Sequence, residues 1–273
     1  MSLFRPAVMR NLTLRALMTL ACAVSVNAFA EKLAVTSARG EKVEVLADFP
    51  AGPGPFPTLV LAPGQAYPMT LPILEQTARQ LVAQGIAVYR FNWAGSATGP
   101  GAGTSSADLV DELQDMHAVL AAAKAAPRVD RDRLFVGGKS LGSMVAWRAL
   151  AGDKSLKAGL FLTAVCSRRQ SGRTAPTYVA DKNYPGAASE TRPLLFISGD
   201  QDPLCAPRAL YRLAENSGAP ARVAIVGGDH SYGDPGLVGE AAERTRKRNI
   251  ASVAQLAANF LVEMAGPQAS MTH

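Results

Sequence analysis

The stretch FVGGKSLGS, residues 135–143, places a serine between two glycines. In the pattern G-x-S-x-G, Gly138 and Gly142 allow a sharp turn between a strand and a helix, with Ser140 at its tip. The stretch also contains GKS, which ends a phosphate-binding loop. Such a loop needs a glycine five positions before Gly138, where this chain has Arg133. The stretch therefore predicts a turn that presents a serine nucleophile and argues against a nucleotide phosphate loop.

The segments on either side of this serine fit such a turn. RLFVGG (133–138) is typical of a buried strand, and LGSMVAWRALAG (141–152) has a helical pattern that ends in glycine. The serine therefore falls between a strand and a helix, as the motif requires. A second interpretation stays open for the motif alone, in which its glycines only let a helix pack closely on a sheet.

Apolar runs alternate with helical patterns along most of the chain. Several runs are unbroken, which is typical of strands covered on both faces of a parallel sheet. We expect a doubly wound, mostly parallel α/β sheet, with an antiparallel edge hairpin at 32–49, where no helix separates two extended pieces. The expected strands are KVEVLADF (42–49), TLVLAPG (58–64), IAVYRFNW (86–93), RLFVGG (133–138), AGLFLTAV (158–165), PLLFISGD (193–200) and RVAIVGG (222–228). The expected helices include LPILEQTARQLVAQG (71–85) and SADLVDELQDMHAVLAAAKAA (106–126), the second with a capping pair at Ser105 and Asp108.

Residues 166–192 show no clear periodicity and are rich in polar, glycine and proline residues. A long irregular loop in a compact domain is usually a lid or a binding segment. We therefore expect a short lid loop here, within a single α/β domain that spans residues 31–273.

A serine nucleophile needs a base that takes its proton and an acid that orients the base. The chain has three histidines. His117 lies inside an expected helix and His273 is the last residue, whereas His230 follows the expected strand at 222–228. Because parallel strands end at one edge of a sheet, His230 is the candidate that a loop can bring to Ser140.

The orienting acid is expected between the serine and the histidine. The strand PLLFISGD runs into a loop that carries Asp200 and Asp202, which are both candidates. Asp229 is a weaker one, because adjacent residues in an extended loop point apart and it is next to His230. Its alternative role is to bond the nearby backbone in a turn.

Three motifs resemble those of the α/β-hydrolase superfamily, particularly its small dienelactone-hydrolase-like branch: GGKSLGS (137–143), SGDQDPL (198–204) and GGDHSY (227–232). The order serine, acid, histidine is the one found in that superfamily. The resemblance covers nearly all of the chain after residue 30 and implies an α/β-hydrolase fold. It also implies that Asp202, the last position of G-x-x-D, is the orienting acid, and that Asp200 helps to shape the turn.

Acyl transfer also requires hydrogen-bond donors for the charge that develops on the carbonyl oxygen. One expected donor is the backbone N–H of Leu141, directly after the nucleophile. The resemblance points to the N–H of Gln65 as the second, with Ala66 as the alternative. Similar enzymes commonly have His-Gly in this loop, where this chain has Pro63-Gly64. The departure concerns this second donor and leaves the serine machinery intact.

Several aromatic and sulfur-containing side chains are candidates for a substrate pocket. Tyr67 and Met69 lie in the loop that follows one expected strand, Trp93 ends another, and Tyr178 and Tyr184 lie in the expected lid. Aromatic side chains in loops more often serve packing, which is the alternative for each of them.

Cys166 and Cys205 follow successive strands of the expected sheet, so they are expected to be neighbours at its carboxyl edge. An oxidising compartment permits a disulfide between such neighbours. We hypothesise this bond, which would tie the expected lid to the loop that carries the acid.

The first thirty residues predict a secretory signal peptide. They carry three arginines before an apolar run at 16–26, and small residues at 28 and 30 precede an expected cut at Glu31. The apolar run is too short for a permanent span, although an uncleaved anchor is the alternative. We expect export to the periplasm or the medium, with no membrane span after cleavage.

The charge of the chain gives little support for a nucleic-acid partner. Cleavage lowers the formal net charge from +6 to +3, because residues 1–30 carry three arginines and no acid. The basic run ERTRKR (243–248) is better explained as the solvated face of a helix start.

These features predict an exported serine hydrolase that cleaves carboxylic esters of small molecules through an acyl-enzyme on Ser140, without a metal or cofactor. Activity should fall at low pH, because a protonated His230 cannot accept the serine proton. Thioesters, lactones and peptides stay open as substrates, because pocket shape sets that choice. The alternative from another class is a non-catalytic binding protein with the same fold.

Overall fold

The computed structural model describes residues 29–95, 104–168 and 175–267. The expected signal peptide lies almost entirely outside these residues. The first strand, β1 (Phe29–Thr36), begins two residues before the expected cut, so cleavage would leave residues 31–36 of this strand in place.

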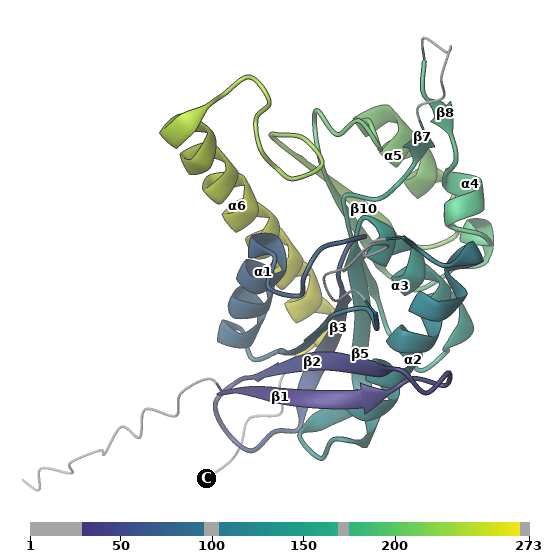
Figure 1. The fold of residues 1–273 in the computed structure, drawn as a ribbon, viewed down its shortest axis with the longest axis vertical. Helices are drawn as coiled ribbons and strands as arrows, with labels where there is room; N and C mark the ends of the chain where they lie inside the picture. Colours follow the sequence, from purple (N-terminus) through teal and green to yellow (C-terminus); the bar gives the residue numbers. More distant parts are fainter. Residues whose placement is uncertain (1–28, 96–103, 169–174, 268–273) are drawn as a thin grey trace, which may run out of the picture.

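An eight-stranded sheet forms the centre of the described structure, in the order β1-β2-β4-β3-β5-β6-β9-β10 (Figure 1). All neighbouring strands from β4 to β10 pair in parallel. The sheet confirms the predicted doubly wound, mostly parallel arrangement. Its remaining strands are β2 (Lys42–Phe49), β3 (Phe56–Ala62), β4 (Ala87–Phe91), β5 (Val129–Lys139), β6 (Gly159–Leu162), β9 (Leu194–Gly199) and β10 (Ala221–Val226).

The apolar runs of the sequence become the inner strands of the sheet. Every residue of β3, β4, β6 and β9 is buried, because helices cover both faces of the sheet at these strands. At the edge, β1 pairs antiparallel with β2, and β2 alternates buried and more exposed residues. The predicted antiparallel edge hairpin is therefore confirmed.

Helices cover the sheet in two layers (Figure 1). On one face, α1 (Pro72–Ala83) and α6 (Gly239–Ala265) bury side chains such as Leu81 and Phe260. On the other face, α2 (Val110–Ala125), α3 (Leu141–Gly152) and α5 (Pro207–Glu215) bury side chains such as Leu120, Trp147 and Leu213 in a second apolar core. The sheet thus lies between two apolar cores, and the loops at its carboxyl edge stay available for chemistry.

The start of α2 differs from the predicted capping pair. The described helix begins at Val110, after a 3-10 turn, η1 (Ala107–Leu109), in which Asp108 and Leu109 have positive φ angles. The Ser106 hydroxyl bonds Glu112 instead, at 2.6 Å, and accepts the N–H of Asp111 at 3.0 Å. The capping prediction was wrong, because Ser106 and a glutamate farther along the helix satisfy this terminus.

The predicted lid segment contains regular structure where the structure describes it. β7 (Ser167–Arg168) and β8 (Thr177–Tyr178) form a two-stranded hairpin, followed by α4 (Ala180–Asn183) and the 3-10 turn η2 (Ala187–Ser189). The hairpin projects from the body of the molecule (Figure 1). Residues 169–174 lie outside the described residues, and the role of the segment as a lid stays a prediction.

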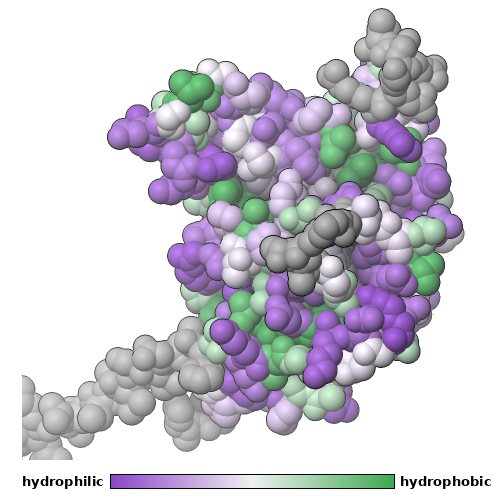
Figure 2. Space-filling model, viewed as in Figure 1, coloured by the Kyte–Doolittle hydropathy of each residue, from purple (hydrophilic) through white to green (hydrophobic). Residues whose placement is uncertain are grey.

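The amino-terminal end of α6 projects beyond the sheet (Figure 1). Its buried side chains begin only at Asn249, and the basic run before it forms ion pairs along the helix, such as Arg244 with Glu240 at 2.9 Å. Figure 2 shows mostly hydrophilic side chains at this end. The two residues before the helix, Leu237 and Val238, are exposed apolar residues. Among the helices of the described residues, none combines the length and the apolarity needed to cross a bilayer.

Two glycines of the opening motif are needed for close packing at the turn. A Cβ atom at Gly138 would lie 2.2 Å from the Gly142 carbonyl oxygen, and one at Gly142 would lie 2.3 Å from the Pro63 carbonyl oxygen. Both distances are far shorter than van der Waals contact. The turn between β5 and α3 therefore packs directly against the end of β3.

The close contact at Gly142 predicts unequal effects of two alanine substitutions in α3. Gly142→Ala should lower the free energy of unfolding by about 1 to 3 kcal/mol, because the new methyl group overpacks against Pro63. Gly152→Ala, at the open end of the helix, should leave it unchanged or raise it by up to about 1 kcal/mol. Thermal unfolding of both variants measures the difference, and equal effects would contradict the tight packing of the turn.

Candidate active site

Ser140 lies in a strained backbone conformation between β5 and α3. Its φ of 55° and ψ of −120° are unusual for a residue with a side chain, and such strain costs about 1 to 3 kcal/mol. Ser143 holds the turn, since its N–H and its hydroxyl both donate to the Ser140 carbonyl oxygen, at 2.9 and 2.5 Å. Ala66, Thr163 and Tyr232 also have positive φ angles, in the loops that follow β3, β6 and β10. Backbone strain is thus concentrated at this edge of the sheet, as it often is at functional sites.

Asp202 lies in the loop that follows β9 and is almost completely buried, with 2% of its surface exposed. The Ser198 hydroxyl donates to its Oδ2 at 2.9 Å, and the Leu204 N–H donates to its Oδ1 at 2.8 Å. A buried carboxylate needs such donors, because an unpaired one is costly in an apolar environment. The two bonds also fix the direction in which the carboxylate points.

His230 is held in a loop that is bonded to its neighbours on both sides. The Gly228 N–H donates to Asp200 Oδ1 at 2.7 Å, and the Gln201 N–H donates to the Gly228 carbonyl at 2.9 Å. From α6, the Asn249 amide donates to the carbonyl oxygens of Gly227 and Tyr232. These bonds bring the histidine loop against the loop that carries Asp202.

The three side chains form one hydrogen-bonded chain. His230 Nδ1 lies 2.9 and 3.0 Å from the two oxygens of Asp202, and Nε2 lies 2.8 Å from Ser140 Oγ. Because a carboxylate only accepts, we assign the proton to Nδ1, which leaves Nε2 to accept the serine hydroxyl. This is the geometry in which a histidine can take the proton of an attacking serine.

The other two aspartates considered from the sequence have different partners. Asp200 binds the N–H of Gly228, which fits a role in shaping the turn. Asp229 Oδ1 accepts bonds from Ser231 and from the Gly233 N–H within its own loop. Burial raises the pKa of Asp229, but these bonds outweigh it and hold the pKa below its ordinary value. The imidazole is hydrogen-bonded to Asp202 and Ser140 instead.

The loop after β3 comes close to Ser140 at Gly64. A Cβ atom at Gly64 would lie 3.3 Å from the Ser140 Cβ, so glycine keeps this approach open. Gln65 and Leu141, the two expected donors to the oxyanion, line the same cavity as Ala66. The structure therefore brings both donor residues beside Ser140 although Pro63 replaces the usual histidine.

Comparison with protein families matches residues 56–262 to the alpha/beta hydrolase domain. The chain belongs to the alpha/beta hydrolase family. The match contains the turn at Ser140 and the loops of Asp202 and His230, so all three predicted motifs lie within the family domain. Comparison with curated proteins found no match.

Solved structures share the fold at low sequence identity. An alpha-beta serine hydrolase homologue from Coxiella burnetii is 16% identical, with a TM-score of 0.65 over 85% of this chain and 97% of that chain. Est1E from Butyrivibrio proteoclasticus, solved with ferulic acid bound, is 15% identical, with a TM-score of 0.67 over 86% of this chain and 100% of that chain. Dienelactone hydrolase from Anabaena variabilis is 16% identical, with a TM-score of 0.63 over 86% and 98%.

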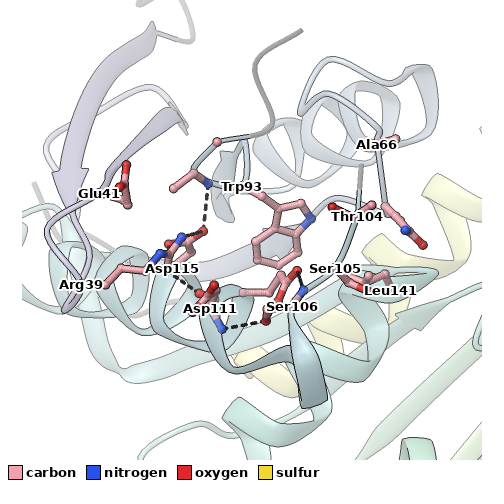
Figure 3. Close-up of a pocket in the computed structure, with 14 residues that line it drawn as sticks. Arg39, Glu41, Ala66, Trp93, Thr104, Ser105, Ser106, Asp111, Asp115 and Leu141 are labelled. Carbon is pink, nitrogen blue, oxygen red and sulfur yellow. Dashed lines mark hydrogen bonds and ion pairs between the residues drawn. The ribbon is translucent and has the colours of Figure 1, made fainter. Parts of the chain in front are cut away.

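A polar cavity of about 430 Å³ is lined by Leu141, which directly follows Ser140, and by Gln65, while Ser140, Asp202 and His230 are not part of its lining (Figure 3). Trp93 lies in it between Ala66 and Leu141 on one side and the Arg39–Asp115 pair on the other. The charged residues that line it are Arg39, Glu41, Asp111, Glu112 and Asp115, so acids outnumber bases by four to one. The wall is thus polar and, in total, negatively charged.

The charged wall is held in place by internal bonds. Asp115 Oδ1 lies 2.8 Å from Arg39, and its Oδ2 accepts the N–H of Ala94 at 2.9 Å. Burial raises the pKa of Asp115, and the Arg39 guanidinium opposes this effect. Among the described residues, no group of three or more histidine, cysteine or acidic side chains is placed to hold a metal ion.

The aromatic candidates divide between the cavity and the core. Trp93 lines the cavity, whereas Tyr67, 37% exposed, and Met69 lie outside its lining. Tyr184 is buried, and its hydroxyl lies 2.8 Å from both Ser143 Oγ and the Val165 N–H. The Tyr178 ring stacks under Arg212. Tyr184 therefore supports the turn that holds Ser140 rather than lining a substrate pocket.

Cys166 and Cys205 form a disulfide in the structure. Both are fully buried, and the N–H groups of Cys166 and Ser167 also donate to the Leu204 carbonyl oxygen. Leu204 itself donates to Asp202. The bond thus joins the start of the predicted lid segment to the loop that carries Asp202.

Two residues at the site were missed in the sequence. Ser198 supports Asp202, and its position four residues earlier in FISGDQD was the only available signal. Lys139 lies inside the G-x-S-x-G motif, yet its side chain is buried and bonds the His230 carbonyl oxygen at 3.0 Å. Lysine is rarely buried so completely. Because the position before the serine in G-x-S-x-G can be any residue, the motif gave no reason to expect a buried lysine there.

Proposed function

We propose that this chain is a serine hydrolase that cleaves carboxylic esters through an acyl-enzyme on Ser140. The observation that carries the proposal is the continuous hydrogen-bonded chain from Ser140 through His230 to Asp202. The shared fold supports the ester class, because the similar structures include a dienelactone hydrolase, and a lactone is a cyclic ester.

In the first half of the reaction, Ser140 Oγ attacks the carbonyl carbon of the ester while His230 Nε2 takes the hydroxyl proton. The negative charge moves to the carbonyl oxygen, where the N–H groups of Leu141 and Gln65 are the proposed donors. Collapse of this intermediate breaks the ester bond, and the imidazolium gives its proton to the departing alcohol. The acyl group is then bound to Ser140 as an ester.

In the second half, water replaces the alcohol and follows the same path. His230 takes a proton from the water as it attacks the acyl carbon, and then returns this proton to Ser140 Oγ. The carboxylic acid leaves and the free serine is restored. In both halves the Asp202 carboxylate accepts a hydrogen bond from His230 Nδ1. Asp202 therefore orients the ring and stabilises the imidazolium.

The non-catalytic alternative explains less of the geometry. A binding protein gains nothing from the strain at Ser140 or from a buried Asp202 that faces His230. Thioesters, lactones and peptides remain compatible with the same three residues, since the leaving group is chosen by the walls of the site.

A fluorophosphonate probe tests the proposed nucleophile directly. The chain from Glu31 onward should acquire one adduct on the peptide that contains Ser140, because only an activated serine attacks such a probe. Ser140→Ala should not be labelled, and labelling of His230→Ala should be lost or slower by orders of magnitude. Peptide mass spectrometry gives the result, and a folded wild-type chain that stays unlabelled would sink the proposal.

Two matched aspartate variants separate the orienting acid from its neighbour as part of this test. Asp202→Asn should lower kcat by about a thousandfold or more, because it leaves His230 in the wrong tautomer. Asp200→Asn keeps an oxygen for the Gly228 N–H and should change kcat by only a few-fold. Similar losses in both variants would argue against Asp202 as the orienting acid.

Because the cavity is polar, we expect the enzyme to prefer polar substrates to substrates with long alkyl chains. Because it is acidic, we expect a preference for cationic substrates over anionic ones. Its acidic residues make the site favourable for a positive group, by a few-fold because exposed charges are screened. Acetylcholine should therefore have a higher kcat/KM than its uncharged isostere 3,3-dimethylbutyl acetate. The ratio should fall in Asp111→Asn, and a wild-type preference for the uncharged ester would contradict this assignment.

We further propose that the chain is exported, on the strength of the N-terminal residues and the disulfide between Cys166 and Cys205. Expression in a bacterium with two membranes should yield a periplasmic product that begins at Glu31 and contains the linked cysteine peptides. A control chain without residues 2–30 should stay in the cytoplasm. Retention of the full-length chain in the cytoplasm, with both thiols free, would contradict export.

A further inference from the structure

Lys139 is a buried lysine that the reaction described above does not use. It is the last residue of β5, directly before Ser140, and only 1% of its surface is exposed. Lysine is almost never buried so fully unless its amine has partners, because an ammonium ion loses its hydration there. The partners of this amine therefore indicate why it is present.

The amine bonds two loops of the site. Lys139 Nζ donates to the carbonyl oxygen of His230 at 3.0 Å and to Thr163 Oγ1, in the loop after β6, at 3.2 Å. It also lies 5.1 Å from the centre of the Tyr67 ring, within the range of a cation–π contact. Three loops at the carboxyl edge thus meet at one ammonium group.

The bond to His230 acts on the catalytic base through its own backbone. The ring of His230 is hydrogen-bonded at both nitrogens, but the position of its backbone determines where the ring can lie. A charged donor makes a hydrogen bond roughly twice as strong as a neutral one. The ammonium therefore fixes the histidine more firmly than a neutral group at the same place.

We propose that Lys139 is a positioning residue, which in its charged form holds the backbone of His230 so that the imidazole stays aligned with Ser140. This inference rests on the proposed function, because it concerns the rate at which that serine reacts. The lysine does not touch the reacting atoms and takes no proton from the substrate.

The charge of Lys139 is lost within an accessible pH range. Burial lowers the pKa of the Lys139 amine from 10.5 to about 8, and the carboxylates of Asp202 and Asp229 oppose this effect. The other titratable groups nearby are Tyr67, His230 and Tyr232, and burial raises the pKa of Tyr232 well above its ordinary value. The charged bond is therefore present below pH 8 and is replaced by a weaker neutral one as the pH rises above it.

A structural role requires a hydrogen-bond donor at this position, because without the amine the His230 carbonyl oxygen and Thr163 Oγ1 lose this partner. It does not require a charged donor, since a neutral one satisfies the same acceptors. The lysine brings a desolvation cost that an apolar residue avoids. This cost has a reason if the charge improves the alignment of His230.

The test compares pH profiles of wild type and Lys139→Met in the hydrolysis of an activated acetate ester, together with the rate of fluorophosphonate labelling. In wild type, kcat should fall to a lower plateau as the pH rises through about 8. In Lys139→Met, kcat and the labelling rate should be lower by about 10- to 100-fold at pH 7, with little change in KM. The step near pH 8 should be absent from this variant.

Two further variants complete the design. Lys154→Met removes an exposed lysine and should leave both the rate and the profile unchanged. Thr163→Val removes one acceptor of the ammonium, so the alkaline step should move to lower pH while the bond to His230 remains. The Thr163→Val and wild-type pH profiles still test the role of Lys139 if Lys139→Met does not fold.

Several outcomes would overturn the inference. Wild-type rates in Lys139→Met would overturn it. A slow Lys139→Met enzyme that keeps the alkaline step would also overturn it, because the lysine would then have only a structural role. A wild-type profile that is flat from pH 7 to pH 9 would also do so. Failure of the wild-type chain to react with the probe at all would instead remove the proposed function itself.

Discussion

The contact between α3 and the end of β3 is the constraint on which the site depends. Gly142 lies so close to the Pro63 carbonyl oxygen that no side chain fits between them. The contact lies two residues after the sharp turn at Ser140, and Gly64, directly after Pro63, lies beside the serine. Ser140 and the residues of both proposed oxyanion donors therefore lie on the two segments that this contact joins.

The site combines strain and buried polarity that the rest of the domain has to offset. Ser140 has an unfavourable backbone conformation, and Asp202 and Lys139 are charged groups in the interior. Each is costly to the folded state, and two apolar cores and a disulfide oppose that cost. Such a balance is common in enzymes, where function is maintained at the expense of stability.

Much of the fold was predictable because its signals are local. Unbroken apolar runs predicted the inner strands, and glycines beside Ser140 predicted the turn that the structure describes. The choice between Asp202 and Asp200 depended on a family resemblance, since both follow the same strand. The prediction for the start of α2 was wrong because Ser106 bonds Glu112 across a turn with positive φ angles. Lys139 was missed because its role arises from contacts with Thr163 and His230, which lie far from it in the sequence. Ser198 lies only four residues before Asp202, but a serine near the end of a strand is not by itself a signal of this role.

The central claim is that Ser140 becomes covalently acylated during turnover. Rapid mixing of the chain with a p-nitrophenyl ester, followed by acid quench and mass spectrometry of the intact protein, tests it most directly. We expect a transient mass increase equal to the acyl group, located on the peptide that contains Ser140 and formed together with a burst of p-nitrophenol. Steady hydrolysis without a burst, with the acyl group never found on Ser140 even when deacylation is slowed, would contradict it.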